Sequence, residues 1–302
     1  MSSTPPSTLA RGLWFMVGSA AAFSLMSALV KLASRTVPTA EIVLARAVVT
    51  LVLSWLMVRR IGRSPWGQDR RRLAMRGAFG FTALACYYWT LGRLPLAEAT
   101  TVHNTAPIWS ALLAWWLLRE RVARSTALGL ALGLAGVVLV ARPWSAGRPE
   151  GLAESLAVLV ALAAALTSAA AYVTVRHLAR TEHPLVIVFY FPLVALPAAL
   201  VWALPGWVTP TWWDALVLLA VGVTTQIGQV CLTYGLANAP TARAMAVGYL
   251  QVAFAIGWGL LAFDEPPGLT TILGALAVVG GTAITAAVGS ARAAATAAAR
   301  GR

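Results

Sequence analysis

Ten long apolar stretches follow one another along the chain, separated by short polar or basic breaks. A helix needs roughly 20 apolar residues to cross a hydrocarbon core about 30 Å thick. The stretches lack the two-residue alternation of membrane strands, and lipid offers an open backbone no hydrogen-bond partner, so all ten are predicted to be helices. The sequence therefore predicts an all-α integral membrane protein with ten transmembrane helices. The predicted spans are residues 12–34, 39–58, 73–92, 97–118, 124–141, 152–175, 184–204, 212–235, 242–263 and 268–289.

Composition and charge agree with this prediction and add an orientation. Hydrophobic residues make up 59% of the chain and charged residues 11%, whereas about a quarter of the residues of a soluble domain are charged. When the breaks are assigned alternately to the two sides, 17 of the 23 lysines and arginines fall on the side of the termini. Lysine and arginine accumulate on the cytoplasmic side. Both termini are therefore predicted to be cytoplasmic, in a cell (inner) membrane protein.

The expected partners are the lipid bilayer and a small-molecule substrate. No nucleic acid is expected, because no basic stretch alternates with the exposed aromatic side chains that stack on bases. No metal or cofactor is expected either. Cys86 and Cys231 lie inside apolar stretches, where they are predicted to be buried and unbridged. The sequence leaves the oligomeric state open, a monomer included.

An internal repeat appears when the chain is aligned with itself at an offset of 145 residues. Residues 86–136 then match 231–281 without a gap, with 11 identities in 51 positions. Each half holds five spans, an odd number, so the second half must be inverted relative to the first across the membrane. Inverted repeats are typical of alternating-access transporters, whose site lies near the midplane between the halves. The matched pairs include Pro95 with Pro240, Glu120 with Glu265, Gly129 with Gly274 and Gly136 with Gly281.

The repeat predicts how the chain is divided. Two inverted five-helix repeats are flanked by short terminal segments and joined by one loop. The predicted parts are a disordered N-terminus at 1–10, a first repeat at 11–142, a connecting loop at 143–150, a second repeat at 151–289 and a cytoplasmic C-terminal tail at 290–302.

Several short motifs occur at corresponding places in the two halves. The first half carries Leu94–Ala99, Pro107, Leu118–Arg121 and the pair Gly129 and Gly136; the second carries Ala239–Ala242, Asp264, Glu265, Gly274 and Gly281. These motifs resemble the EamA module of the drug/metabolite transporter superfamily, and Lys31 and Arg46 match positions where that family is often basic. The resemblance implies a ten-helix transporter made of two EamA-like repeats. Within the superfamily, the chain length and the aromatic-rich third and fourth spans are similar to YddG-type amino-acid exporters. The sequence departs from the pattern at Val252, which stands opposite Pro107.

Polar side chains inside the spans are the candidate substrate-binding residues, because polar groups are costly to insert into lipid. On the fourth span, Pro107 is predicted to kink the helix and to free the carbonyl of His103 one turn earlier. An imidazole, an amide and a free carbonyl at such a kink can bind an amino or hydroxyl group. The substrate-binding candidates are Ser24, Tyr88, His103, Asn104, Trp109, Ser168, Tyr172, Gln226, Gln229, Tyr249 and Gln251.

Each candidate also has a structural interpretation. Gln226 and Gln229 share a helix face, and their amides suit a neutral or zwitterionic substrate, but amides also join membrane helices. Hydroxyls such as that of Ser24 equally bond carbonyls of their own helix. Tyr88 and Trp109 lie too deep for an interfacial aromatic belt, and they are candidates for the wall of an apolar cavity. The belt itself is assigned to Trp14, Trp55, Trp207, Trp212 and Trp213.

The charged residues near the span ends have mainly structural interpretations. Glu120 and Glu265 close the fourth and ninth spans, and each is predicted to pair with an arginine or to cap the following helix. Arg46 either snorkels outward, pairs with Glu41 or contacts a substrate carboxylate. No carboxylate lies in the middle of a span, which argues against proton coupling through an acid.

These observations predict a carrier that exports small neutral or zwitterionic metabolites, above all amino acids including aromatic ones. Transport of sugar phosphates, nucleotide sugars or drugs is the alternative within the superfamily. Sugar-phosphate exchange needs two or more basic residues in the central cavity, whereas Lys31, Arg46 and Arg176 are predicted near helix ends. A polytopic membrane enzyme is the remote alternative. It needs paired acids with a metal, or a His/Asp pair, and only His103 lies inside a span, so no enzyme is expected.

Overall fold

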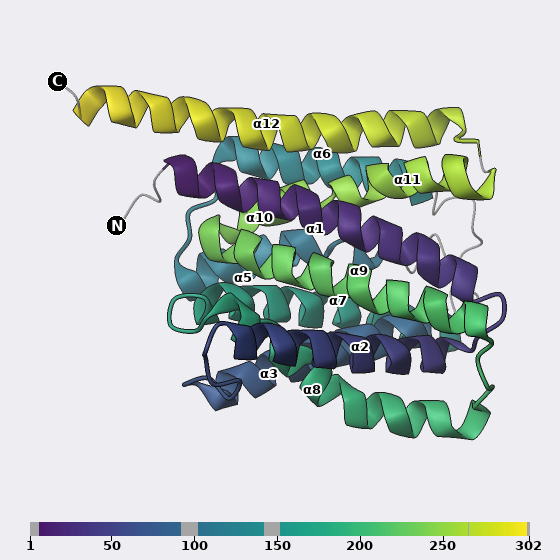
Figure 1. Ribbon diagram of the computed structural model, residues 1–302. Helices are drawn as coiled ribbons and strands as arrows, with labels where there is room; N and C mark the ends of the chain where they lie inside the picture. Colours follow the sequence, from purple (N-terminus) through teal and green to yellow (C-terminus); the bar gives the residue numbers. More distant parts are fainter. Residues whose placement is uncertain (1–5, 92–101, 142–151, 265, 301–302) are drawn as a thin grey trace.

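The computed structural model describes residues 6–91, 102–141, 152–264 and 266–300. Within these ranges the chain is helical, with no strand, and the helices run roughly alongside one another (Figure 1). The first half contains α1 (Pro6–Ala33), α2 (Thr39–Arg60), α3 (Arg70–Leu91), α5 (Ala106–Leu118) and α6 (Arg124–Ala141). The second half contains α7 (Leu152–Leu178), α8 (Pro184–Ala203), the 3-10 turn η2 (Leu204–Gly206), α9 (Trp212–Asn238), α10 (Thr241–Gly248), α11 (Leu250–Phe263) and α12 (Leu269–Arg300).

The predicted fold class is confirmed: the protein is an all-α integral membrane protein whose ten spans form two inverted five-helix repeats. Six described helical segments are long and apolar enough to cross a membrane, α10 and α11 together forming one of them, and α5, α6 and the first part of α12 are shorter apolar helices. Two helices differ from the expected limits. The first begins at Pro6, and the last continues to Arg300 through the expected tail.

Large apolar side chains cover the outside of the bundle. Trp14, Trp116, Trp212 and Leu261 are each more than 70% exposed. In water such side chains would be unfavourable, but lipid tails accept them. All five tryptophans assigned to the interfacial belt are exposed, between 40% and 79%.

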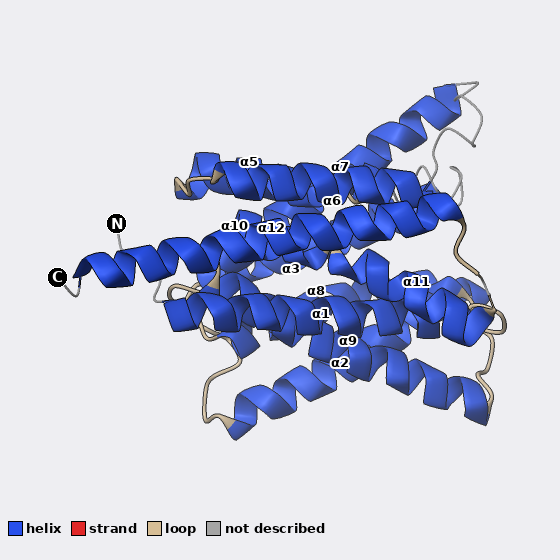
Figure 2. Cartoon of the chain, turned by 90° about the horizontal axis from the view of Figure 1, so that it is seen from above, coloured by secondary structure: helices blue, strands red, loops and turns tan. Residues whose placement is uncertain are grey.

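The two repeats pack on each other through pairs of equivalent contacts. Helix α1 packs against α9, and α7, the equivalent of α1, packs against α3, the equivalent of α9. The equivalent helices α2 and α8 contact each other, as do α6 and α12, which lie side by side in Figure 1. Figure 2 shows the same bundle turned by 90°. These pairings are those of an approximate two-fold axis between the halves.

Glycines on α6 and α12 show the inversion directly. A Cβ atom added to Gly129 would lie 2.6 Å from the carbonyl oxygen of Gly281, and one added to Gly136 would lie 2.5 Å from that of Gly274. The residue number rises along one helix as it falls along the other, so the two helices are antiparallel. Small residues let backbones in a membrane approach this closely.

The close contact between α6 and α12 gives a prediction for the stability of the folded protein. A Gly274→Ala substitution is expected to lower the free energy of unfolding by about 1–3 kcal/mol, because the new methyl group would lie 2.6 Å from the Gly136 carbonyl oxygen and 2.7 Å from Val140 Cγ2. The melting temperature in detergent measures the effect. Gly280→Ala, on the same helix with no atom within 4 Å, is the matched control. Equal melting temperatures for the two variants would contradict the described packing.

The repeat is also visible in the backbone. The only described non-glycine residues in the left-handed region are Arg119, at φ 54°, and Asp264, at φ 52°, 145 residues apart. They end α5 and α11, the equivalent helices of the two halves. The same helix ending thus occurs before Glu120 and before Glu265, although Glu265 itself lies outside the described residues.

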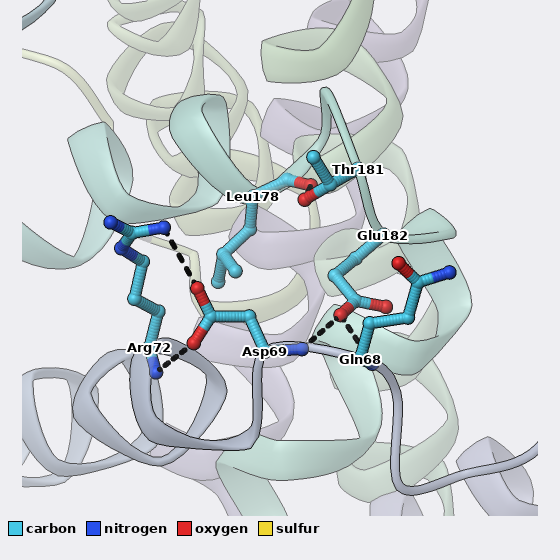
Figure 3. Close-up of polar contacts among 6 residues, drawn as sticks. All are labelled: Gln68, Asp69, Arg72, Leu178, Thr181 and Glu182. Carbon is cyan, nitrogen blue, oxygen red and sulfur yellow. Dashed lines mark hydrogen bonds and ion pairs between the residues drawn. The ribbon is translucent and has the colours of Figure 1, made fainter.

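Carboxylates join the two repeats at both ends of the bundle. At the end that holds both termini, Glu182 accepts hydrogen bonds of 2.6 Å from the backbone nitrogens of Gln68 and Asp69 (Figure 3). At the opposite end, Glu41 accepts a bond of 2.5 Å from the nitrogen of Val208, and Thr36 donates to Asp214 at 2.6 Å. Both ends of the interface are therefore held by polar contacts between the halves.

Candidate functional site

Two helices that face each other across the repeat interface are discontinuous. Helix α5 begins at Ala106, after a turn at Asn104 and Thr105. In the second half α10 ends at Gly248 and α11 begins at Leu250, with a turn at Tyr249. Asn104 and Tyr249 are 145 residues apart, so the breaks fall at the same repeat position. Discontinuous helices at such positions are typical of transporter binding sites.

The prediction of a proline kink was wrong in detail. Pro107 lies in the first turn of α5 and not inside a longer helix, because a proline has no backbone N–H to lose there and its φ suits a helix start. The second half breaks at the equivalent place without a proline, directly after Gly248. Among the described residues, the Tyr249 hydroxyl donates a hydrogen bond of 3.0 Å to the backbone carbonyl of Asn104. The carbonyl that binds a side chain is therefore that of Asn104 and not that of His103.

The two breaks are surrounded by other predicted residues. Tyr249 is 2% exposed, and its ring lies against Gly133 of α6, where a Cβ atom would overlap it. The His103 ring lies 4.4 Å from that of Tyr87, and its Nδ1 is buried without a hydrogen-bond partner. Trp109 donates its indole N–H to Thr105 at 3.1 Å. We call Asn104, Thr105 and Tyr249 the helix breaks. The side chains of Tyr87, His103 and Trp109 lie around them.

A second polar group lies among α2, α3, α7, α8 and α9. Arg76 of α3 is 3% exposed and donates from Nη2 to the Gln229 side-chain oxygen of α9 at 3.0 Å. Its guanidinium carbon lies 5.1 Å from the ring centre of Phe191, and that of Arg46 lies 5.6 Å from the same ring. Tyr172 of α7 lies close enough to interact electrostatically with Arg76. We call Arg46, Arg76, Tyr172, Phe191 and Gln229 the arginine cluster.

The placement of both arginines corrects the sequence interpretation. Arg76 is one of the 17 basic residues counted on the side of the termini, yet its side chain is buried inside the bundle. Arg46 does not pair with Glu41, whose Oε1 binds the Val208 nitrogen and whose Oε2 has no hydrogen-bond partner. One signal was available: both arginines lie inside the predicted spans 73–92 and 39–58.

Glycines on α3 make the room for Arg76. A Cβ atom on Gly77 would lie 2.8 Å from the carbonyl oxygen of Tyr190, so α3 and α8 are in close contact there. A Cβ atom on Gly80 would lie 2.8 Å from the Phe191 ring and 3.1 Å from Arg76 Nη1. A larger residue at either position would push α8, and with it Phe191, away from the arginine.

Gln226 joins α9 to α2 beside the arginine cluster. It is 3% exposed, accepts a hydrogen bond from Ser54 at 3.1 Å and donates to the Met57 sulfur at 3.4 Å. The predicted pair Gln226 and Gln229 lies near the middle of α9, Gln226 buried and Gln229 half-buried, but the two residues have different partners. Gln226 contacts the neighbouring helix, whereas Gln229 contacts a cation.

The remaining predicted site residues are scattered. Ser24 donates to its own helix at Ala21 and accepts a bond of 3.2 Å from the Trp258 indole. Ser168 is buried one turn before Tyr172, and Gln251 is half-buried in α11. The side chain of Tyr88 lies outside the described part of the structure. The structure thus brings Tyr172 and Gln229 together at one place, and His103, Asn104, Trp109 and Tyr249 at another.

Glu120 has the structural role predicted for it. Its carboxylate accepts a hydrogen bond of 2.8 Å from Arg176 Nε and another of 2.9 Å from the Thr241 nitrogen at the start of α10. Arg176 also donates to the carbonyls of Leu236 and Ala237 at the end of α9, at 2.9 and 2.8 Å. This network joins α5 of the first repeat to α7, α9 and α10 of the second.

A cavity of about 500 Å³ lies between the ends of α3, α5 and α7 at the termini end of the bundle. Arg71, Arg72, His177 and Asp69 contribute its polar wall. Excess positive charge at such an opening attracts anions.

The sequence matches the EamA-like transporter family twice, over residues 10–142 and 155–287. The chain belongs to this family. The two matches correspond to the two halves, and the EamA-like fold accounts for the inverted pairing of equivalent helices. Because its family is one of transporters, the protein is a membrane transporter with a small-molecule substrate.

Individual relatives of this EamA-like protein agree with that assignment. The pseudopaline exporter CntI of Pseudomonas aeruginosa is 32% identical over 272 residues, covering 90% of this chain and 94% of the exporter. Solute carrier family 35 member G1 of Mus musculus is 28% identical over 285 residues, covering 89% of this chain and 76% of the carrier. A solved crystal structure superimposes with a TM-score of 0.81 at 18% identity, covering 95% of this chain and 98% of that one, which shows a shared fold.

Proposed function

We propose that this EamA-like transporter exports small metabolites related to amino acids by alternating access. One observation carries the proposal: Arg76 and Gln229, from different repeats, meet at 3.0 Å in the buried interface. Inverted-repeat transporters bind their substrates at such an interface. A cation and a polar amide there suit a substrate that has a carboxylate and hydrogen-bonding groups.

The direction follows from the predicted orientation and from one relative. Basic residues gather at the end of the bundle that holds both termini, which favours a cytoplasmic location for that end. The basic cavity between α3, α5 and α7 opens at the same end, so anionic metabolites would meet it from the cytoplasm. The relative that is 32% identical is an exporter. These features support outward transport across a cell (inner) membrane.

The choice among substrates is narrowed by the arginine cluster. YddG-type export of aromatic amino acids remains our prediction from the sequence, and Phe191 and Tyr172 offer aromatic surface for it. Transport of sugar phosphates or nucleotide sugars is the second candidate. Transport of sugar phosphates needs two basic residues inside the bundle, and the sequence alone placed the basic residues near helix ends. Arg46 and Arg76, which both lie beside Phe191, meet that requirement.

Counterflow into proteoliposomes tests the proposal. Proteoliposomes that contain the purified protein and are loaded with unlabelled compound should accumulate labelled amino acids or amino-acid-derived acids. The accumulation should depend little on a pH gradient. His103→Ala and Gln226→Ala should each reduce the initial rate without loss of folded protein, since His103 lies beside the helix breaks and the buried Gln226 lies beside the arginine cluster. Accumulation of sugars or polyamines alone would refute the substrate class, and unchanged rates in both variants would refute the assigned site.

A further inference from the structure

Arg76 has hydrogen-bonding capacity that no described residue uses. Its side chain is 3% exposed, and its Nε and Nη1 atoms are buried with no hydrogen-bond acceptor. Only Nη2 is engaged, by the neutral Gln229. No acidic side chain of the described ranges forms an ion pair with Arg76.

A cation buried in this way is costly. Removing a charge from water costs several kcal/mol unless a counter-charge and hydrogen bonds replace the water, and ionisable residues inside membrane bundles mark ligand pathways by default. The guanidinium carries five N–H donors in a planar fork. Gln229 accepts one of them, so each edge of the fork keeps a donor for a further acceptor.

The other members of the arginine cluster indicate what that acceptor is. Arg46 adds a second positive charge beside Phe191, whereas Gln229, Tyr172 and Phe191 are neutral. The described cluster thus contains no acid that would bind a substrate ammonium. A planar guanidinium matches a planar carboxylate, and charge-assisted bonds of this kind are about twice as strong as neutral ones.

We propose that Arg76 is the receptor for a substrate carboxylate, and that the substrate is recognised as an organic acid, its amino group being dispensable. This inference rests on the proposed function, since it names the substrate group that the exporter binds. The carboxylate bonds to the open edges of the Arg76 fork, Gln229 holds the guanidinium in place from the other side, and Phe191 packs beside it. Gly80 puts no side chain next to Nη1, where a Cβ atom would lie 3.1 Å away.

A matched series of probes tests the proposal: glutarate with two carboxylates, glutaramate with one, glutaramide with none, and inorganic phosphate as the other common oxyanion. Binding is followed by the rise in melting temperature of the purified protein as the probe is titrated, because a ligand of the folded state stabilises it. Glutaramate should bind about 10- to 100-fold more tightly than glutaramide, the range expected for a hydrogen-bonded charge pair. Glutarate should bind at least as tightly as glutaramate.

Variants assign the binding to Arg76. Arg76→Gln should remove the preference for glutaramate over glutaramide, and Arg76→Lys should restore part of it, because lysine keeps the charge but not the fork. Arg60→Gln, at the exposed end of α2 and away from the cavity and the arginine cluster, should leave the preference unchanged. Equal binding of glutaramate and glutaramide, binding of neither, or an unchanged preference in Arg76→Gln would overturn the proposal. Tighter binding of phosphate through Arg76 would overturn the choice of a carboxylate.

Failure of this inference and failure of the proposed function give different results. If neutral amino acids are carried in counterflow but the acid preference is absent, the carboxylate receptor is wrong and the transport function stands. If glutaramate binds through Arg76 but no amino-acid-derived compound crosses the membrane, the receptor stands and the substrate class of the transporter is wrong.

Discussion

Arg76→Met is expected to lower the transport rate strongly while making the folded protein more stable. Methionine fills a similar volume without a charge, so the desolvation cost of a buried cation disappears. Replacing buried ions by apolar residues often stabilises a protein by about 1–4 kcal/mol, whereas the hydrogen bond to Gln229 and the contact of the guanidinium with the Phe191 ring are lost against this gain. The initial counterflow rate should fall at least about 10-fold, as for the loss of a charged hydrogen bond, and the melting temperature should rise.

The opposite signs of the two effects separate a functional arginine from a structural one. A structural Arg76 would lose stability and transport together. The control is Arg60→Met, which removes an exposed arginine at the end of α2 and should change neither quantity appreciably. Normal transport by Arg76→Met would show that the arginine cluster is not the site.

The second large effect is expected at the contact between Glu120 and Arg176. Both side chains are less than a fifth exposed, and each also binds the backbone at the junction of α9 and α10. Removing one partner of a buried pair costs about 3–5 kcal/mol, and the remaining exposure here places the loss toward about 2–3 kcal/mol. Glu120→Ala should therefore lower the melting temperature strongly.

A double-mutant cycle isolates this interaction. Glu120→Ala, Arg176→Met and the double variant are compared with the same set at Asp69 and Arg72, the exposed pair. We expect a coupling energy of about 2 kcal/mol or more for the first pair and at most about 1 kcal/mol for the second. Equal coupling energies would show that the Glu120 network does not hold the repeats together.

The fold was predictable because each of its signals is local or periodic. Span length follows from the thickness of the bilayer, and the offset of 145 residues indicated two copies of one unit. The paired glycines of α6 and α12 and the equivalent helix ends at Arg119 and Asp264 are the structural counterparts of that offset. The inversion followed from counting five spans in each half.

The site was predictable only in part. Gln229 and Tyr172 were identified because polar groups inside spans are few, but their partner Arg76, near the end of its span, was counted with the basic residues of the cytoplasmic side and not as a site residue. Where that side chain points depends on the close contact of α3 with α8 at Gly77, a tertiary feature that spacing along one helix does not contain. The break at Tyr249 was likewise missed, since no proline marks it.

We propose that the site between the repeats opens to each side of the membrane in turn. A single cysteine tests it most directly: Gln229→Cys in a chain whose Cys86 and Cys231 are replaced by alanine, with Ser64→Cys in the exposed α2–α3 loop as the one-sided control. We expect a membrane-impermeant maleimide to label position 229 from either side of the membrane and position 64 from the cytoplasmic side alone. Labelling of position 229 from one side only, under every substrate condition, would contradict alternating access at this site.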